Sequence, residues 1–351
     1  MSKLRLEKSP APAWVRPVIP LMAIVVTFLI TIIFIVWVQA NPLHTYYYFL
    51  IAPFTSTVTI VELLVKATPL FLTGAAVAFA FKAGYYNIGA EGQLTAGAIM
   101  GAWLGVLLEG TTPWIALPVM IIGGFIGGVL WALIPALLRV KLKVDEVVTT
   151  LLMNSVIVFF VSYLLNGPWR DPVSFWPQSP DIAQSAMFFR LIPGTRLHFG
   201  FILGVFVLFS IWLIISRTAF GLKMRAAGSN AEASRFAGIN VEKTILVTAL
   251  VSGGIAGLAG VGEVAGIHFH LIQGLSANLG YTGIIVATLG ALNPFGVGIA
   301  ALFIGLIDTG SLTVSRALGV PVYLGQVVQA TLLLVTLGMF ILTNYRLKRE
   351  G

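Results

Sequence analysis

Amide and carboxylate side chains gather in one short run of an otherwise apolar sequence, where they could line a polar pathway. The run covers residues 86–93, Tyr-Asn-Ile-Gly-Ala-Glu-Gly-Gln, and contains Asn87, Glu91 and Gln93. Its glycines disfavour a regular helix start. Irregular backbone and a carboxylate are tolerated at membrane depth where they face protein or a water-filled cavity. We interpret the run as a broken helix beside a pathway. The alternative is a turn in which Glu91 caps a helix or pairs with Lys82.

Further polar residues fall within apolar runs later in the chain. With these included, the candidate pathway residues are Asn87, Glu91, Gln93 and Asn154. For Glu91 we favour a structural or gating role over direct contact with a solute. Glu263 and Asp308 are the clearest acids within predicted spans, and such acids often mark proton relays.

Two other pairs have simpler interpretations. Glu62 and Lys66 are four residues apart, which favours a structural ion pair on one helix face. His268 and His270 are two apart, so they do not share a helix face, and no third ligand is near in sequence. We therefore predict no metal site.

The sequence lacks the motifs that would indicate an enzyme. It contains no cysteine, no G-x-x-x-x-G-K-[ST] phosphate loop, no H-E-x-x-H and no G-x-S-x-G. Residues 260–265 match G-x-G-x-x-A, but that motif needs a preceding strand, and here it lies inside an apolar helical run. We predict no catalytic, cofactor-binding or metal-binding residue in this chain.

The composition indicates a membrane protein with many spans. Of 351 residues, 58% are apolar and 10% are charged, whereas soluble proteins have about 45–50% and about 25%. We predict an all-α, polytopic membrane helix bundle of about ten transmembrane helices. The first span is 18–38; the others are 58–81, 86–108, 114–138, 146–165, 198–216, 244–266, 276–291, 295–313 and 322–343.

The basic residues predict the orientation of these spans. With both termini in the cytoplasm, all but five of the 21 Lys and Arg residues fall in cytoplasmic segments, and the five are Lys66, Arg170, Arg190, Arg196 and Arg316. This bias accounts for the net charge of +8 without a nucleic-acid partner. We predict a cytoplasmic N-terminal segment (1–17), one membrane domain (18–345) and a cytoplasmic tail (346–351). Residues 166–197 would form an external loop, either an ordered cap or a plain anchoring loop.

The longest cytoplasmic segment, 217–243, contains a predicted short helix at 230–237. Ser229 and Glu232 have the spacing of a capping box, and Gly238 suits the position after a helix C-terminus. Ala233, Phe236 and Ala237 would form a small apolar face. Because so short a helix is marginal alone, it should pack either on its own bundle or on a partner protein.

Glycines at four-residue spacing recur, and they predict close helix packing in lipid. They are Gly97, Gly101 and Gly105, Gly123 and Gly127, Gly124 and Gly128, and Gly253 and Gly257.

Several of these stretches resemble the permeases of ABC importers for simple sugars, nucleosides and branched-chain amino acids. The resemblance lies in residues 86–93, in 221–230 continuing to 237–239, and in 289–296. Residues 145–154 and 167–172 are similar to the nucleoside branch.

The resemblance implies a type II-like permease subunit of a bacterial inner-membrane importer. It implies that residues 217–243 couple the permease to an ATPase through Ser229, Glu232, Ala233, Phe236 and Gly238. The implied partners are ABC ATPase subunits holding ATP and Mg²⁺, a second identical or homologous permease, and an extracytoplasmic binding protein. Nucleosides are the expected substrates. The alternatives are a sugar or branched-chain amino-acid permease and, from another class, an ion-coupled secondary transporter or channel.

Overall fold

Helices form nearly all of the regular structure in the part of the chain that the computed structural model describes, residues 4–8 and 18–349. The α-helices are α1 (Val18–Trp37), α2 (Pro42–Tyr46), α3 (Thr57–Lys82), α4 (Ala90–Leu107), α5 (Pro113–Leu142), α6 (Glu146–Asn166), α7 (Gly200–Arg217), α8 (Ala219–Ser229), α9 (Ala231–Phe236), α10 (Val241–Glu263), α11 (Leu279–Leu289), α12 (Pro294–Leu318) and α13 (Leu324–Asn344). This confirms the predicted all-α, polytopic bundle.

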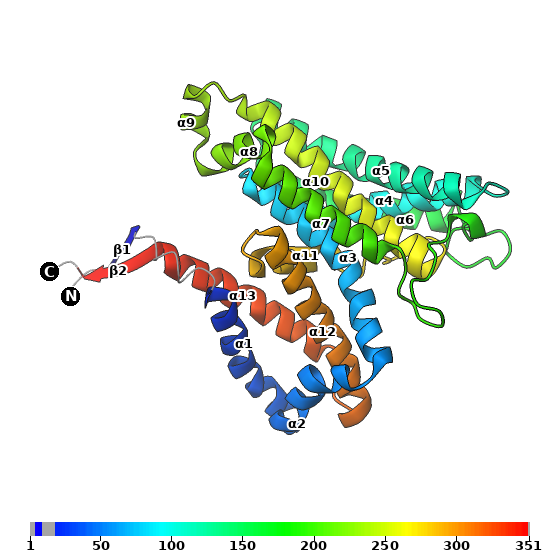
Figure 1. Ribbon diagram of the computed structural model, residues 1–351, viewed down its shortest axis with the longest axis horizontal. Coiled ribbons are helices and arrows are strands. Elements are labelled where there is room, and N and C mark those ends of the chain that lie inside the picture. Colours follow the sequence, from blue (N-terminus) through cyan, green and yellow to red (C-terminus); the bar gives the residue numbers. More distant parts are fainter. Residues whose placement is uncertain (1–3, 9–17, 350–351) are drawn as a thin grey trace.

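Short elements complete the described chain. There are π-helices at Tyr47–Ile51 and Val264–His268, and 3₁₀-helices at Ala52–Thr55 and Gln184–Ala186. Strand β1 (Leu4–Lys8) pairs antiparallel with β2 (Tyr345–Arg349), so the two ends of the described chain lie side by side (Figure 1). Of the predicted terminal segments 1–17 and 346–351, residues 1–3, 9–17 and 350–351 lie outside the described residues.

Most predicted spans agree with a helix to within a few residues. Among the described residues, seven helices are long and apolar enough to cross a membrane: α1, α3, α5, α6, α7, α10 with its π-helical end, and α12. α4 and α13 coincide with two further predicted spans. The predicted span 276–291 is wrong as a full crossing, because α11 has only 11 residues. At 1.5 Å per residue it reaches about 16 Å, roughly half of a bilayer core of about 30 Å.

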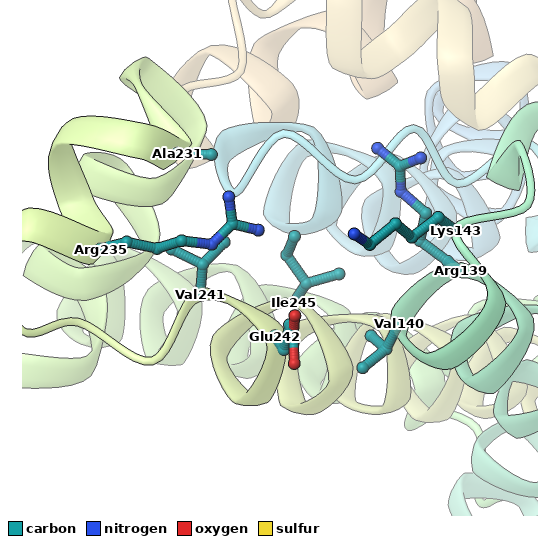
Figure 2. Close-up of a pocket in the computed structure, with 8 residues that line it drawn as sticks. All are labelled: Arg139, Val140, Lys143, Ala231, Arg235, Val241, Glu242 and Ile245. Atoms are coloured by element: carbon teal, nitrogen blue, oxygen red, sulfur yellow. The ribbon is translucent and has the colours of Figure 1, made fainter.

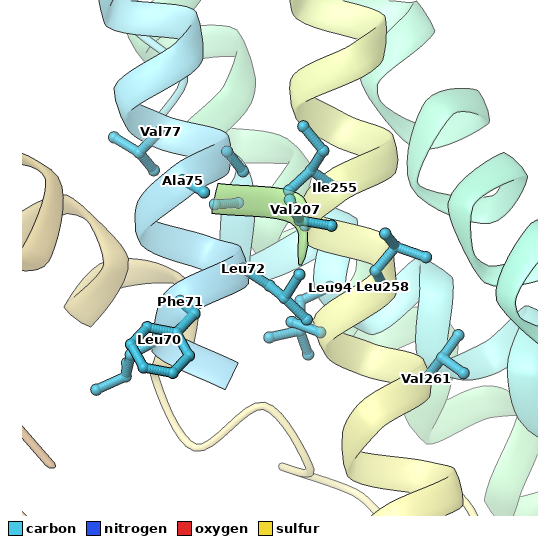
Figure 3. Packing of buried hydrophobic residues seen from close by; sticks show 14 of the residues in the cluster. Leu70, Phe71, Leu72, Ala75, Val77, Leu94, Val207, Ile255, Leu258 and Val261 are labelled. Carbon is cyan, nitrogen blue, oxygen red and sulfur yellow. The ribbon is translucent and has the colours of Figure 1, made fainter. Parts of the chain in front are cut away.

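The helices form two groups that share α3 (Figure 1). One group contains α4 to α10, and the other contains α1, α2, α12 and α13, with α11 between them. α3 packs against α7, α10, α11 and α12, and its C-terminal two thirds is buried. Close to this shared helix, Leu72 of α3, Leu94 of α4 and Leu258 of α10 interdigitate (Figure 3).

Glycines bring the backbones of α4, α5 and α10 into direct contact, as their spacing predicts. A Cβ on Gly97 of α4 would lie 2.2 Å from the carbonyl oxygen of Gly257 on α10. A Cβ on Gly257 would in turn lie 2.3 Å from the carbonyl oxygen of Gly124 on α5, and one on Gly128 would lie 2.1 Å from that of Gly253. Lipid supplies no hydrophobic force between helices, so this close van der Waals contact is what holds the three helices together.

Gly257→Ala is therefore expected to lower the free energy of unfolding of the solubilised protein by about 1–3 kcal/mol, because the added methyl group meets backbone that has no side chain to move aside. The measurement is thermal unfolding in detergent. Gly262→Ala is the matched control on the same helix, since a Cβ there meets nothing within 4 Å. Equal stability of the two variants would contradict the proposed backbone contact.

The predicted external loop, 166–197, is an ordered cap and not a plain anchoring loop. Its backbone pairs with the connection after α10: Ile182 donates to the carbonyl of Phe269 (2.8 Å) and Phe188 donates to that of Ala265 (2.8 Å). Directly after the loop, His198 is buried in space that two glycines leave open, Gly200 and Gly266.

Candidate functional site

Residues 83–89 between α3 and α4, which we call the broken segment, form a turn, and with Glu91 capping a helix they fit the alternative given above better than a broken helix beside a pathway. α3 ends at Lys82, and α4 begins only at Ala90. Gly84 between them has a φ of 75°, in the left-handed region that favours glycine. The amides of residues 83–85 and of Asn87 bond to nearby carbonyls within the turn, whereas the amides of Tyr86, Ile88 and Gly89 need side-chain partners.

Asn87 holds this segment to α4. Its side chain is fully buried and forms a reciprocal amide pair with Gln93: Asn87 Nδ2 donates to Gln93 Oε1 (2.8 Å), and Gln93 Nε2 donates to Asn87 Oδ1 (3.1 Å). Asn87 Oδ1 also accepts from the amide of Gly89 (2.9 Å). Asn87 Nδ2 donates to Ser252 Oγ of α10 (2.9 Å), and Ser252 donates to the carbonyl of Ala76 on α3 (2.7 Å). Two amide side chains and one hydroxyl thereby join α3, α4 and α10.

A polar stripe on α6 supplies partners for the rest of the broken segment. Glu146, Thr150 and Asn154 are spaced four residues apart, so they share one face of α6, and all three are buried. The amide of Tyr86 donates to Glu146 Oε1 in a long hydrogen bond (3.4 Å), and that of Ile88 donates to Thr150 Oγ1 (3.3 Å). The segment therefore lies along three successive turns of α6.

Asn154 makes the last and shortest bonds of this stripe. Its Oδ1 accepts from the amide of Gly92 (2.9 Å), and its Nδ2 donates to the carbonyl of Ile88 (3.0 Å). The same Nδ2 lies 3.0 Å from the hydroxyl of Tyr281 on α11. A Cβ on Gly92 would lie 2.9 Å from Asn154 Oδ1, so glycine is required for this approach. The two stretches 86–93 and 145–154 are thus two halves of one interaction.

Glu91 caps a helix, but not its own. Its Oε2 accepts from the amide of Gly280 (2.7 Å) and its Oε1 from that of Asn278 (3.1 Å), at the N-terminus of α11. Asn278, the residue before α11, provides no side-chain cap. A carboxylate at this end is stabilised by the unpaired amides and by the helix dipole. Of the two roles that the alternative interpretation gave Glu91, the structure shows capping of a helix and not a pair with Lys82.

The structure therefore brings all four candidate pathway residues together. We call Asn87, Glu91, Gln93, Asn154 and Ser252 the polar junction. Each is buried, with at most 7% of its surface exposed. The hydrogen bonds described above give every one of them a structural role at the meeting point of α3, α4, α6, α10 and α11. Direct contact of these residues with a transported solute stays a prediction.

The other predicted acids lie apart from the polar junction. Glu263 Oε2 lies 3.7 Å from His268 Nε2, and Asp308 Oδ1 accepts from Gln329 Nε2 (2.6 Å). A role for Glu263 or Asp308 in a proton relay stays a prediction.

The remaining predicted pairs differ from what the spacing indicated. Glu62 pairs with Arg196 of the capping loop, so the predicted Glu62–Lys66 pair is wrong. A sequence separation of four allows such a pair but does not exclude a better-placed partner from another segment. His270 lies 3.0 Å from Asp181. Within the described residues, no group of three His, Asp or Glu side chains could hold a metal ion.

In the predicted coupling segment, the short helix is present as α9, but its cap differs from the prediction. Asn230 is the N-cap, and its Oδ1 accepts from the amide of Ala233 (3.0 Å). Ser229 instead ends α8 and donates to the carbonyl of Arg225 (2.8 Å). The predicted capping box of Ser229 and Glu232 is therefore wrong. Asn is as good a cap as Ser, and α8 extends one residue further than the capping box assumes.

The end and the exposed face of α9 agree with the sequence. Gly238 has a φ of 80° and donates to the carbonyl of Arg235 (2.9 Å), while Ile239 donates to that of Ser234 (2.9 Å), which together form a Schellman motif. The predicted apolar face does not pack on its own bundle: Ala233 and Ala237 are exposed, and Phe236 is 94% exposed. The alternative of packing against a partner remains.

Sequence reasoning missed several residues of the site. Glu146 and Thr150 carried a usable signal, because with Asn154 they place three polar side chains on one face of an apolar helix. Asn230 was identifiable as a rival cap by residue type alone. Ser252 and Tyr281 carried no such signal, since a single hydroxyl in an apolar helix gives no indication of its partner.

Comparison with known proteins assigns a family to this arrangement. A family model described as "Branched-chain amino acid transport system / permease component" matches residues 59–337. A glucose ABC transporter permease protein of Haloferax volcanii is 32% identical, over 99% of this chain and 93% of the relative. A guanosine ABC transporter permease protein of Bacillus subtilis is 33% identical (83% and 84% covered), and a nucleoside ABC transporter permease protein of Lactococcus lactis is 30% identical (93% and 92%). No solved structure matches the chain.

Proposed function

Because this chain belongs to the family of branched-chain amino acid transport system permease components, we propose that it is one transmembrane subunit of an ATP-driven ABC importer for nucleosides. In this proposal an extracytoplasmic binding protein delivers the substrate, and this chain forms the pathway together with a second permease. ATP and Mg²⁺ are held by separate ATPase subunits in the cytoplasm. The short helix α9 and both termini would lie on that side of a bacterial inner membrane.

The observation that carries the ATP-driven part is the exposure of α9. A six-residue helix does not persist in water without support, yet α9 holds Phe236 94% exposed. An aromatic side chain exposed on a capped element is typical of an interface anchor. In this proposal Phe236 lies at the contact with the ATPase, and Asn230 and Gly238 fix the two ends of α9. The full set of residues proposed for coupling is Ser229, Glu232, Ala233, Phe236 and Gly238.

The contact of α8 with the broken segment offers a physical link from α9 to the polar junction. Gly228 lies near the C-terminal end of α8, and a Cβ there would lie 2.3 Å from the carbonyl oxygen of Lys82. Gly84 in turn approaches Gly228 across the same contact. A shift of α9 by an ATPase would displace α8 against the turn at residues 83–89, and that turn leads directly to Asn87.

Two of the relatives described above support the nucleoside assignment, since their names state guanosine and nucleoside transport. The glucose permease relative supports the alternative of a sugar substrate at a similar level of identity.

Uptake by proteoliposomes tests both parts of the proposal. The vesicles would contain this chain, its second permease and its ATPase, with the binding protein outside. We expect uptake of labelled guanosine that requires internal ATP and is competed by other nucleosides but not by glucose or leucine. Competition by glucose would favour the sugar alternative. Uptake driven by a proton or sodium gradient without any ATPase would overturn the ATP-driven assignment.

A further inference from the structure

A small basic pocket lies where α5 ends and α10 begins (Figure 2). Its volume is about 280 Å³. It is lined by Arg139 and Val140 from α5, by Lys143 directly after α5, by Arg235 from α9, and by Glu242 and Ile245 from α10. Lys143 and Arg235 extend into it from opposite sides (Figure 2). Three separate elements thus contribute to one site.

The depth of the pocket follows from the helices around it. α5 and α10 are both long and apolar enough to cross a membrane, and the pocket lies at the C-terminal end of the first and the N-terminal end of the second. α6, a third such helix, begins at Glu146, three residues after Lys143. Where several spans end together, the surrounding medium changes from acyl chains to lipid headgroups.

The charge of the pocket suits a ligand with a single negative charge. Arg139 is already paired with Glu146, its Nε lying 3.0 Å from the carboxylate. Within the described residues no carboxylate lies within 4.0 Å of the charged group of Lys143 or Arg235, although Glu242 lines the same pocket. Two cations and one further carboxylate leave an excess of one positive charge.

Apolar side chains lie in the pocket and are exposed elsewhere on α5. Leu142 is 68% exposed beside Lys143, and Val140 and Ile245 line the pocket itself. Further along α5, Ile126, Leu130 and Ile134 lie exposed four residues apart. A ligand with an anionic headgroup and long apolar chains matches the basic pocket and the exposed apolar side chains of α5.

We propose that this pocket binds the phosphate of an anionic phospholipid between Lys143 and Arg235, with the acyl chains along the exposed face of α5. Basic pockets between membrane helices are a recognised setting for anionic headgroups. The lipid would bridge α9 and the ends of α5 and α10, and it would thereby restrict the movement of α9 and of Phe236. The proposal is independent of which solute the permease carries.

An acidic side chain from a partner ATPase is the competing occupant. The lipid is favoured because most of the lining comes from the ends of α5 and α10, and although α9 contributes Arg235, Phe236, the residue proposed for the ATPase contact, does not line the pocket. The competing occupant is therefore treated as an outcome of the test.

The experiment is a titration of the purified full-length chain in detergent with short-chain phosphatidylglycerol, followed by thermophoresis. Near a membrane surface each Lys or Arg adds about a fivefold gain in affinity for an anionic lipid. Lys143→Gln alone should therefore weaken binding about fivefold, and Lys143→Gln with Arg235→Gln about 30-fold. Lys141→Gln is the matched control, because Lys141 is exposed on the same helix turn and does not line the pocket. It should bind like the unaltered protein.

Several results would overturn the proposal. The lipid would be excluded if the double variant bound phosphatidylglycerol as tightly as the control, or if phosphatidylcholine bound as tightly as phosphatidylglycerol. If inorganic phosphate bound as tightly as the lipid, the acyl chains would add nothing to the affinity and the proposed lipid site would be wrong. If Lys143→Gln reduced copurification of the ATPase while lipid affinity stayed unchanged, the pocket would be a protein contact.

Discussion

Glu91→Ala is expected to lower the free energy of unfolding of the solubilised protein by roughly 2–4 kcal/mol, because it removes the cap of α11 and leaves one buried and one half-buried amide without an acceptor. Those amides belong to Asn278 and Gly280, and Glu91 receives both through its two carboxylate oxygens. Gly280 has no room to adjust, since a Cβ there would lie 2.1 Å from the backbone nitrogen of Glu91. Thermal unfolding in detergent measures the loss.

Glu91→Gln separates the structural role of Glu91 from a role in the pathway. Glutamine keeps the shape and one acceptor oxygen but presents a donor to the second amide, so stability should fall by an intermediate amount. Uptake should then fall in step with the amount of folded protein. Glu109→Gln is the matched control, an exposed acid just beyond the other end of α4. Full stability with abolished uptake would instead support direct contact with the solute, and wild-type uptake would remove Glu91 from the candidates.

Phe236→Asp should separate the permease from its ATPase while leaving the bundle folded. Phe236 is 94% exposed, so its replacement costs little stability. An aromatic anchor buried in an interface is worth about 2–4 kcal/mol, which corresponds to roughly a 30- to 1,000-fold loss of affinity. The measurement is the yield of ATPase that copurifies with the tagged permease, together with thermal unfolding of the permease alone.

Two variants define the specificity of that result. Phe236→Leu retains an apolar side chain and should keep most of the association. Val173→Asp alters a residue that is 85% exposed in the capping loop, which packs near the opposite end of α10, and it should have no effect on the ATPase. Normal stoichiometry and transport with Phe236→Asp would show that α9 is not the coupling element.

Hydropathy and charge bias predict the long helices to within a few residues, because a buried apolar run of that length has few alternatives in lipid. They fail at residues 276–291, where α11 has only 11 residues. An apolar run gives no sign of where its helix starts when the cap comes from elsewhere in the chain. At α11 the cap is Glu91, 187 residues away from Asn278.

The same limit applies to the site. The residue types at 87, 91, 93 and 154 show that something polar is built there, since such groups are too costly inside a membrane to be incidental. Their partners depend on tertiary contacts, as with Asn87 and Ser252, which are 165 residues apart. Local rules also compete at close range. Ser229 and Asn230 are adjacent residues of nearly equal capping strength, and the length of α8 decides between them.

The glycine contacts among α4, α5 and α10 have a mechanical consequence. Where Gly97, Gly124, Gly128, Gly253 and Gly257 meet, backbone touches backbone, so no side chain at these contact points can change rotamer and allow the helices to slide. The three helices should therefore move as one rigid unit during a transport cycle. We expect relative movement between this unit and the other group of helices, which contains α1, α12 and α13. Residues 83–89 connect α3 to α4 and thus to this rigid unit. We expect the relative movement to be accommodated at this turn.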